Sequence, residues 1–183
     1  LERIEVPRLA PEWKPLSLAQ IARMNGESDK ERALRLQALK LNALTGSKFS
    51  RIAQLRRLSE MEIDAGHREQ ARGYMEEALS LSDQVGRRDL RALMLIELAT
   101  LDAEHPQALR LLEEALLLAE EFKLNGLAAL CLFMLGSREM AQGKFQSAER
   151  HLNDALSRLA PGSPVREQTE RLLHIVQGRS KPG

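Results

Sequence analysis

Three blocks in the middle of the chain carry the same pattern of small and apolar residues. In each block an alanine follows a small residue after five positions, a large apolar residue comes four positions later, and an Ala-Leu pair follows three positions after that. The blocks span residues 66–79, 103–116 and 143–156. The two alanines of a block are seven residues apart, about two turns of an α-helix, so they share one face. The pattern therefore predicts three helices, each with a closely packed face.

A second amphipathic segment precedes each block. These segments cover residues 50–65, 88–102 and 126–142. Gly66 and Gly143 suit the tight turn that joins such a segment to the following block. In the second block Pro106 takes the place of a turn glycine, because proline fits the first turn of a helix. The repeating unit is therefore predicted to be an antiparallel helical hairpin.

The blocks resemble the tetratricopeptide repeat (TPR) family, whose second helices carry Ala, a large apolar residue and Ala-Leu at these offsets. The resemblance covers residues 50–160. It implies an all-α fold, a right-handed superhelix (an α-solenoid) of antiparallel hairpins with about eight or nine helices. Ala71, Ala108 and Ala148 are 37 and 40 residues apart, whereas the standard repeat has about 34 residues. This spacing is similar to the long-repeat variant of bacterial signalling regulators and cell-polarity scaffolds.

Two positions depart from the family pattern at the end of a first helix. The family usually has tyrosine or another large apolar residue there, whereas this chain has Glu62 and Glu139. Two explanations stay open. Either Ile63 and Met140 take over the packing, or the register of the first helices differs by one residue.

The ends of the chain are predicted from proline positions and capping signals. Residues 1–15, in which Pro7, Pro11 and Pro15 flank Trp13, are expected to form an extended leader. Trp13 then packs on the first hairpin or binds a groove, its own or that of a neighbouring chain. Residues 16–47 are expected to form a degenerate hairpin or cap.

Within this first hairpin, Ser28 and Glu31 have the spacing of a capping box at a helix start. Residues 48–160 then hold the three TPR-like hairpins. Residues 163–177 are predicted to form a final capping helix, because an array of repeats needs a polar end. Residues 178–183 are expected to be a mobile tail.

The amino-acid composition supports a helical fold and agrees with a protein that does not span a membrane. Hydrophobic residues make up 43% of the chain and aromatics only 3%, a mixture that favours helix over strand. No apolar run is long enough to span a bilayer, so we expect no membrane insertion. The first residues are not a secretory signal, and a start at Leu1 is expected of a fragment or a processed chain. We expect a cytoplasmic protein, with Cys131 as a core thiol.

The net charge of +1 hides a gradient along the chain. Residues 1–58 carry +6, residues 59–128 carry −8 and residues 129–183 carry +3. Such a gradient orients a charged partner, or it reflects solvated outer helix faces. The basic run that includes Arg51, Arg56 and Arg57 has no interleaved aromatic residues for base stacking. Direct nucleic-acid binding is therefore not expected.

No constellation of catalytic residues is present in the sequence. The four histidines lack the spacing of a helical metal pair, and the glycines are scattered singly rather than gathered in a phosphate loop. Acidic pairs such as Glu76-Glu77 recur with the repeat, which indicates solvent-facing positions. We expect no enzyme activity, no metal and no cofactor.

The resemblance also implies where a partner binds, because the first helices of such hairpins line the concave surface. At these offsets the second and third hairpins are mostly apolar, whereas the first contributes two arginines. The predicted partner-binding residues are Arg56, Arg57, Leu90, Leu93, Met94, Leu101, Leu130, Phe133, Met134 and Met140. The prediction is an apolar groove with a basic rim at its amino-terminal end.

Such a groove favours a non-enzymatic protein–protein interaction module, a scaffold or adaptor that binds an amphipathic helix or an apolar peptide. We expect it to be part of a larger regulatory or assembly protein. The alternative is a ligand- or peptide-sensing domain of a transcriptional regulator. It also stays open whether the groove is covered by tighter curvature, by the leader or by a second copy of the chain in a homodimer.

Overall fold

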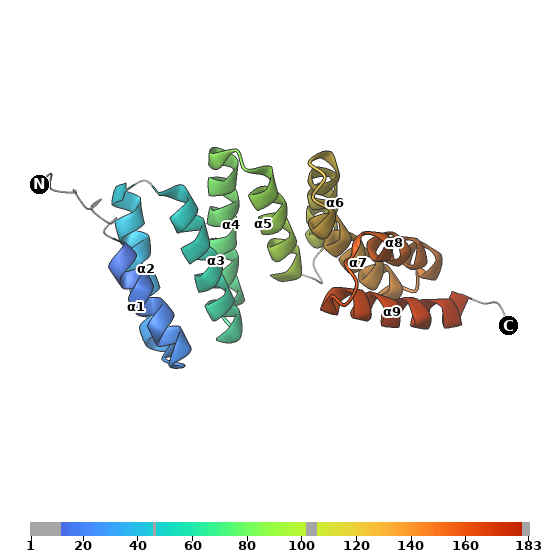
Figure 1. The fold of residues 1–183 in the computed structure, drawn as a ribbon, viewed down its shortest axis with the longest axis horizontal. Helices are drawn as coiled ribbons and strands as arrows, with labels where there is room; N and C mark the ends of the chain where they lie inside the picture. The colour runs from blue at the N-terminus through green and yellow to red at the C-terminus, as the bar shows by residue number, and fades with distance from the viewer. Residues whose placement is uncertain (1–11, 46, 102–105, 181–183) are drawn as a thin grey trace, which may run out of the picture. The chain divides into compact units, whose positions relative to one another are not determined.

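The computed structural model describes residues 12–45, 47–101 and 106–180. This described part of the chain contains helices and turns and no β-strand. Its nine helices are α1 (Trp13–Met24), α2 (Ser28–Thr45), α3 (Lys48–Asp64), α4 (Arg68–Val85), α5 (Arg88–Leu101), α6 (Pro106–Glu121), α7 (Asn125–Ala141), α8 (Phe145–Arg158) and α9 (Pro164–Ser180). The first eight pair in chain order as antiparallel hairpins (Figure 1). The predicted all-α architecture of helical hairpins is confirmed.

The chain divides into two compact units between Gly86 and Arg87. The first unit contains α1 to α4, and in it α2 packs on α3. The second unit contains α5 to α9, in which α6 packs on α7 and α9 packs on both α8 and α7.

The alanines of the repeat blocks form the core of the hairpins. All six are completely buried, and the large apolar residue between each pair is at most 2% exposed. The residues are Ala71, Met75 and Ala78 in α4, Ala108, Leu112 and Ala115 in α6, and Ala148, Leu152 and Ala155 in α8. Small side chains on one face let the partner helix approach closely, as the pattern predicted.

A glycine allows the closest approach in the second unit. Gly136 is buried in the middle of α7, and a Cβ atom at this position would lie 2.8 Å from Cγ of Leu152 in α8. A separation under 3.0 Å is too short for two carbon atoms, so a side chain at Gly136 would push α7 and α8 apart. The repeat pattern did not identify this position, because the pattern is read from the second helices.

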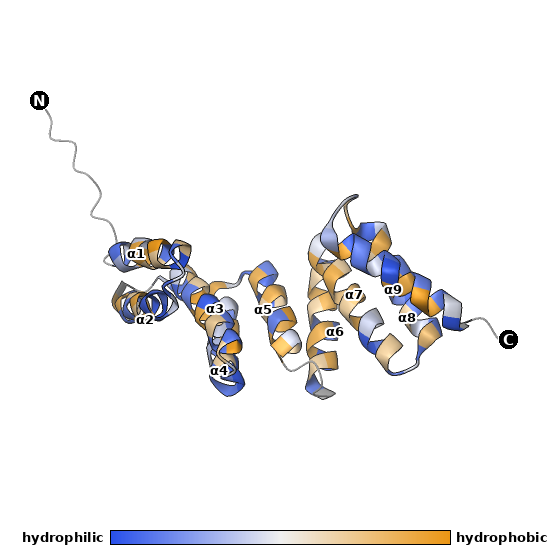
Figure 2. Cartoon of the chain, turned by 90° about the horizontal axis from the view of Figure 1, so that it is seen from below, coloured by the Kyte–Doolittle hydropathy of each residue, from blue (hydrophilic) through white to orange (hydrophobic). Residues whose placement is uncertain are grey.

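The hydropathy of the helices in the second unit follows their packing. Figure 2 shows hydrophobic residues predominating along α6, and many hydrophilic residues along α9. Helix α6 contacts both α5 and α7, whereas α9 follows the last hairpin and, among the described helices, contacts α7 and α8. A helix enclosed by neighbours needs a wider apolar surface than a terminal one.

The expected extended leader is wrong in its last residues. Helix α1 begins at Trp13, so residues 13–15 are helical. Pro15 is buried in the first turn, where its missing N–H breaks no helical hydrogen bond. Trp13 is 54% exposed. Residues 1–11 lie outside the described residues.

Two further expectations at helix ends are also wrong. Helix α9 continues to Ser180, so the expected tail of residues 178–183 is helical in its first three residues, and residues 181–183 lie outside the described ones. Glu31 does not complete a capping box with Ser28. Its carboxylate is instead buried and accepts hydrogen bonds from arginines of α2 and α3.

The two glutamates that depart from the family pattern are both held by neighbouring side chains, and Glu62 is buried. Glu62 is 1% exposed. Its Oε1 accepts a hydrogen bond from Arg32 Nε at 2.7 Å, and its Oε2 lies 2.8 Å from His67 Nδ1. Burial disfavours the charged carboxylate, but the hydrogen bonds from His67 and Arg32 outweigh it and hold the pKa of Glu62 below its ordinary value. Ile63 is 46% exposed and does not take over the packing.

Glu139 in α7 is held in a similar way. Ser147 Oγ of α8 donates to its Oε1 at 2.5 Å, and His151 Nδ1 lies 2.7 Å from its Oε2. Here Met140 does pack, against the core cluster of Ala148, Leu152 and Val176. At both positions the carboxylate joins a first helix to the residues that follow it, which explains how glutamate replaces a large apolar residue.

Candidate functional site

Arg57, one of the two predicted basic rim residues, lies in a buried ionic cluster of the first unit. Its Nε and Nη2 atoms donate to the two carboxylate oxygens of Glu31, each at 2.9 Å, and its Nη1 donates to Glu60 at 2.9 Å. Arg35 Nε donates to the same Glu31 at 2.7 Å. Arg57 therefore links α3 to α2, and we do not include it in a partner surface.

The chemistry of this cluster is that of a bidentate arginine–carboxylate pair. Hydrogen bonds from Arg57, assisted by Arg35 and opposed by burial, lower the pKa of Glu31 to about 2. The same pairing raises the pKa of Arg57. Both groups stay charged across the physiological pH range. The cluster therefore holds α2 and α3 together. Arg56, the other predicted rim residue, is half-buried on α3.

Two of the predicted groove residues in the second unit are inaccessible. Met94 in α5 is completely buried, and Leu101 at the end of α5 is 7% exposed. Including them as partner-binding residues is therefore a wrong prediction, since neither side chain can reach a partner. Leu90, Leu93 and Leu130 are half-buried.

Two predicted residues, Phe133 and Met134, come together at an apolar hollow of about 500 Å³ in the second unit. We call it the α5–α7 hollow. Its lining residues are Ala99 of α5, Leu112 of α6, Phe133, Met134, Ser137, Arg138 and Ala141 of α7, and Gln142. Leu112 and Ala99 are buried beneath it, in one core cluster with Ala108 and Leu135. The third predicted residue of α7, Met140, does not line the hollow.

The α5–α7 hollow is built where three helices meet. Met134 packs against the core cluster of Ala99 and Leu112, while Phe133 packs against the cluster of α8 and α9. Each side chain is half-buried, so one side is held by the core and the other borders the hollow. The contributions of Ala99 and Leu112 were not predicted, because the offsets of one helix do not show which neighbouring helices lie beneath it.

A second hollow, of about 460 Å³, lies at the turn between α7 and α8. We call it the α7–α8 turn hollow. It is lined by Gly143, Lys144, Phe145, Gln146, Ser147, Arg150 and Arg179. The Arg179 guanidinium of α9 stands over the Phe145 ring, 5.9 Å from its centroid, within the range of a cation–π contact. Sequence reasoning missed this site because its cations come from a turn and two helices.

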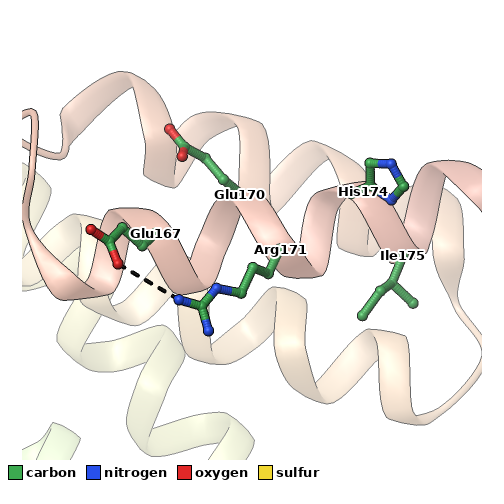
Figure 3. A pocket seen from close by; sticks show the side chains of 5 residues that line it. All are labelled: Glu167, Glu170, Arg171, His174 and Ile175. Carbon is green, nitrogen blue, oxygen red and sulfur yellow. Dashed lines mark ion pairs between the residues drawn. The ribbon is translucent and has the colours of Figure 1, made fainter.

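The outer surface of α9 forms an open depression, to which we assign no function. Glu167, Glu170, Arg171, His174 and Ile175 line it, and all five belong to one helix. Figure 3 shows Arg171 reaching back toward Glu167, with 3.6 Å between the paired atoms. Such a polar surface is what the predicted cap at the end of the repeats requires.

The residues that the structure describes contain no cluster of three or more His, Cys, Asp or Glu side chains that could hold a metal ion. None of the helices in the described ranges has the length and hydropathy of a membrane span.

Solved structures with folds similar to this chain include TPR-like repeat proteins. BtubC (BKLC) from P. vanneervenii superposes with a TM-score of 0.77 at 19% identity, over 91% of this chain and 72% of that one. The nearly identical TPR-like repeats of a Podosopora anserina kinesin light chain give a TM-score of 0.67 at 20% identity, over 91% of this chain and 85% of that one. The chain has a TPR-like fold. The resemblance seen in the repeat blocks is thus confirmed at the level of the fold.

The MamA protein is a more distant TPR-like neighbour, with a TM-score of 0.59 at 15% identity, over 92% of this chain and 91% of that one. No protein-family profile matches the chain, and no curated protein does. The TPR-like fold therefore rests on the three-dimensional arrangement of the hairpins and on the repeat blocks.

Proposed function

We propose that this TPR-like chain is a non-enzymatic interaction module that binds an apolar peptide segment, such as one face of an amphipathic helix, in the α5–α7 hollow. The observation that carries the proposal is the lining of that hollow. Phe133 and Met134 border about 500 Å³ of open space above the buried Ala99 and Leu112. Binding is favourable when an apolar side chain fills such an apolar concavity, because apolar surface is then removed from water.

The remaining lining residues suit a peptide. Ser137, Arg138 and Gln142 form the polar part of the hollow, where a peptide backbone needs hydrogen-bonding groups. Met134 adds a flexible thioether that adapts to different apolar side chains. First helices, here α5 and α7, are also the elements that line the binding surface in stacked hairpins. We place the module within a larger regulatory or assembly protein, as the long repeats of signalling regulators suggest.

A second candidate function follows from the size of the hollow. A volume of about 500 Å³ lies within the usual range for small-molecule sites. The chain would then be a ligand-sensing domain, for example of a transcriptional regulator. Peptide selection distinguishes the two functions, because a site shaped for a small molecule enriches no common apolar peptide motif.

Ala141 offers a clean test of the proposed function. It lines the α5–α7 hollow at the end of α7 and is exposed, so Ala141→Glu places a charge in the hollow without removing a core contact. The matched control is Ala160→Glu, at an exposed alanine of the same unit that does not line the hollow.

The experiment selects peptides from a displayed random library against the full chain and measures their affinity by fluorescence anisotropy. We expect selected peptides to share apolar residues, to lose about tenfold or more in affinity for Ala141→Glu, and to bind Ala160→Glu like the wild type. Failure to enrich any peptide, or enriched peptides that bind Ala141→Glu unchanged, would contradict the proposal.

A further inference from the structure

The α7–α8 turn hollow is lined by three cationic side chains and by no carboxylate among the described residues. Lys144, Arg150 and Arg179 are its charged lining residues, and all three are exposed. Among the described residues none of the three forms an ion pair, whereas other arginines of the second unit, such as Arg91 and Arg158, do. Three cations around one concavity raise its local potential and attract anions.

The polar groups beside the hollow make hydrogen bonds of their own. Ser147, which lines the hollow, donates to Glu139, and the other oxygen of that carboxylate meets His151. Lys144 is the N-cap of α8 and makes no side-chain capping hydrogen bond. The first-turn N–H groups of α8 therefore add to the positive potential that the three cations create.

The basic and apolar hollows adjoin in the chain and in space. Gln142 lines the α5–α7 hollow, and the next residue, Gly143, lines the α7–α8 turn hollow; consecutive Cα atoms are about 3.8 Å apart. Gly143 has φ +75°, a left-handed conformation that glycine adopts without strain. Hydrogen bonds from Gly143 N to Met140 O at 3.0 Å and from Lys144 N to Glu139 O at 2.9 Å hold the turn.

From this juxtaposition we infer that the ligand is a peptide with two features: an apolar side chain for the α5–α7 hollow, and a nearby anionic group for the α7–α8 turn hollow. The inference rests on the proposed function and names the class of peptide. Arginine forks and lysine bind carboxylate and phosphate alike. The anionic group is therefore an acidic side chain or a phosphorylated one that lies close to the apolar anchor in the peptide.

Linking two contacts in one peptide makes the second contact intramolecular, which raises affinity without a large interface. The anionic contact is exposed, so salt screens it. The apolar contact is much less sensitive to salt. The two contributions therefore separate in a titration at two ionic strengths.

The test uses three synthetic peptides that share the apolar sequence selected against the full chain. Their flanking residues are glutamine, glutamate or phosphoserine. The protein variants are K144Q/R150Q and, as a control with the same loss of net charge, K40Q/R68Q at exposed positions of the first unit. Affinities are measured at low salt and at about 0.5 M salt, an ionic strength at which exposed charge pairs are largely screened.

We expect a peptide with an anionic flank to bind the wild type about tenfold more tightly than the glutamine peptide at low salt, or about 1.4 kcal/mol. The flank that gives the larger gain identifies carboxylate or phosphate as the group recognised. The gain should shrink at high salt, disappear in K144Q/R150Q and persist in K40Q/R68Q.

Equal binding of all three peptides, or a gain that survives K144Q/R150Q, would overturn the inference and leave the proposed function standing. If no peptide of any flank binds, the proposed function fails and the inference fails with it.

Discussion

The buried carboxylate of Glu31 gives the sharpest prediction about stability, through the variant Glu31→Gln. The Glu31 side chain is 2% exposed and accepts hydrogen bonds from Arg35 and Arg57. Its pKa is about 2 in the fold, compared with an ordinary value of 4.5. Such a group contributes roughly 3 kcal/mol at neutral pH. Glutamine keeps the shape but leaves two guanidinium groups without their shared counter-charge, so we expect a loss of roughly 3 kcal/mol.

The sign of the pH dependence follows from the lowered pKa. The contribution of Glu31 is fully present above its ordinary value of 4.5 and is lost as the pH falls toward about 2. The defect of Glu31→Gln should therefore shrink to less than half at about pH 3. The reason is that the wild type loses the same stabilisation by protonation as the pH falls from 4.5 toward about 2.

Urea unfolding at both pH values, followed by far-ultraviolet circular dichroism, measures the free energy. Amide hydrogen exchange of α2 and α3 assigns the loss to the first unit, because two units need not unfold together. Glu76→Gln is the control, at a glutamate whose pairing with Arg72 is exposed and contributes less than about 1 kcal/mol. A defect of Glu31→Gln below about 0.5 kcal/mol, or one of equal size at both pH values, would refute this reasoning.

Three further predictions concern packing, backbone conformation and reactivity. Gly136→Ala should destabilise the second unit by about 1–3 kcal/mol in urea unfolding, since the new Cβ would meet Leu152. The control is Gly73→Ala, whose Cβ would meet no side chain of a non-adjacent residue within 4 Å, and it should be neutral or stabilising in the same assay. Lys123→Gly should stabilise the protein by up to about 1 kcal/mol in the same assay, because Lys123 has φ 55° where other turns have glycine; a loss would contradict this. Cys131, whose pKa burial raises to about 12, should react with iodoacetamide only on unfolding, and rapid native labelling would disprove it.

Much of the fold could be predicted because the repeat blocks record helix packing directly. An alanine that is completely buried against a partner helix, such as Ala71 or Ala148, cannot be enlarged without separating the helices. The spacing of these alanines therefore appears in the sequence as a periodic signal. The hairpins and their approximate boundaries follow from that signal.

The ends and the polar core were harder to predict because a local sequence signal has more than one structural outcome. Pro15 is compatible with an extended segment and with the first turn of a helix, and only the packing of α1 on α2 decides. The position of Glu31 in the sequence is compatible with a capping box and equally with a buried ion pair. The choice depends on Arg57, 26 positions later in the chain.

The candidate site was predicted only in part, for a related reason. The family offsets select Phe133 and Met134, which border an open hollow. They also select Met94 and Leu101, which are buried, because an offset along one helix does not show how closely its neighbours cover it. No periodic pattern links the three cations of the α7–α8 turn hollow. Lys144 lies in a turn, whereas Arg150 and Arg179 lie on two different helices.

The methionine methyl groups offer the most direct measurement of peptide binding at the α5–α7 hollow. The chain has 6 methionines. Met134 lines the hollow, whereas Met24 in α1 is 79% exposed and belongs to the first unit. In spectra of protein labelled with 13C at the methionine methyls, a selected peptide should shift Met134 in proportion to occupancy and leave Met24 in place. A Met134 signal that does not move at saturation, with Met24 moving instead, would contradict binding at the hollow.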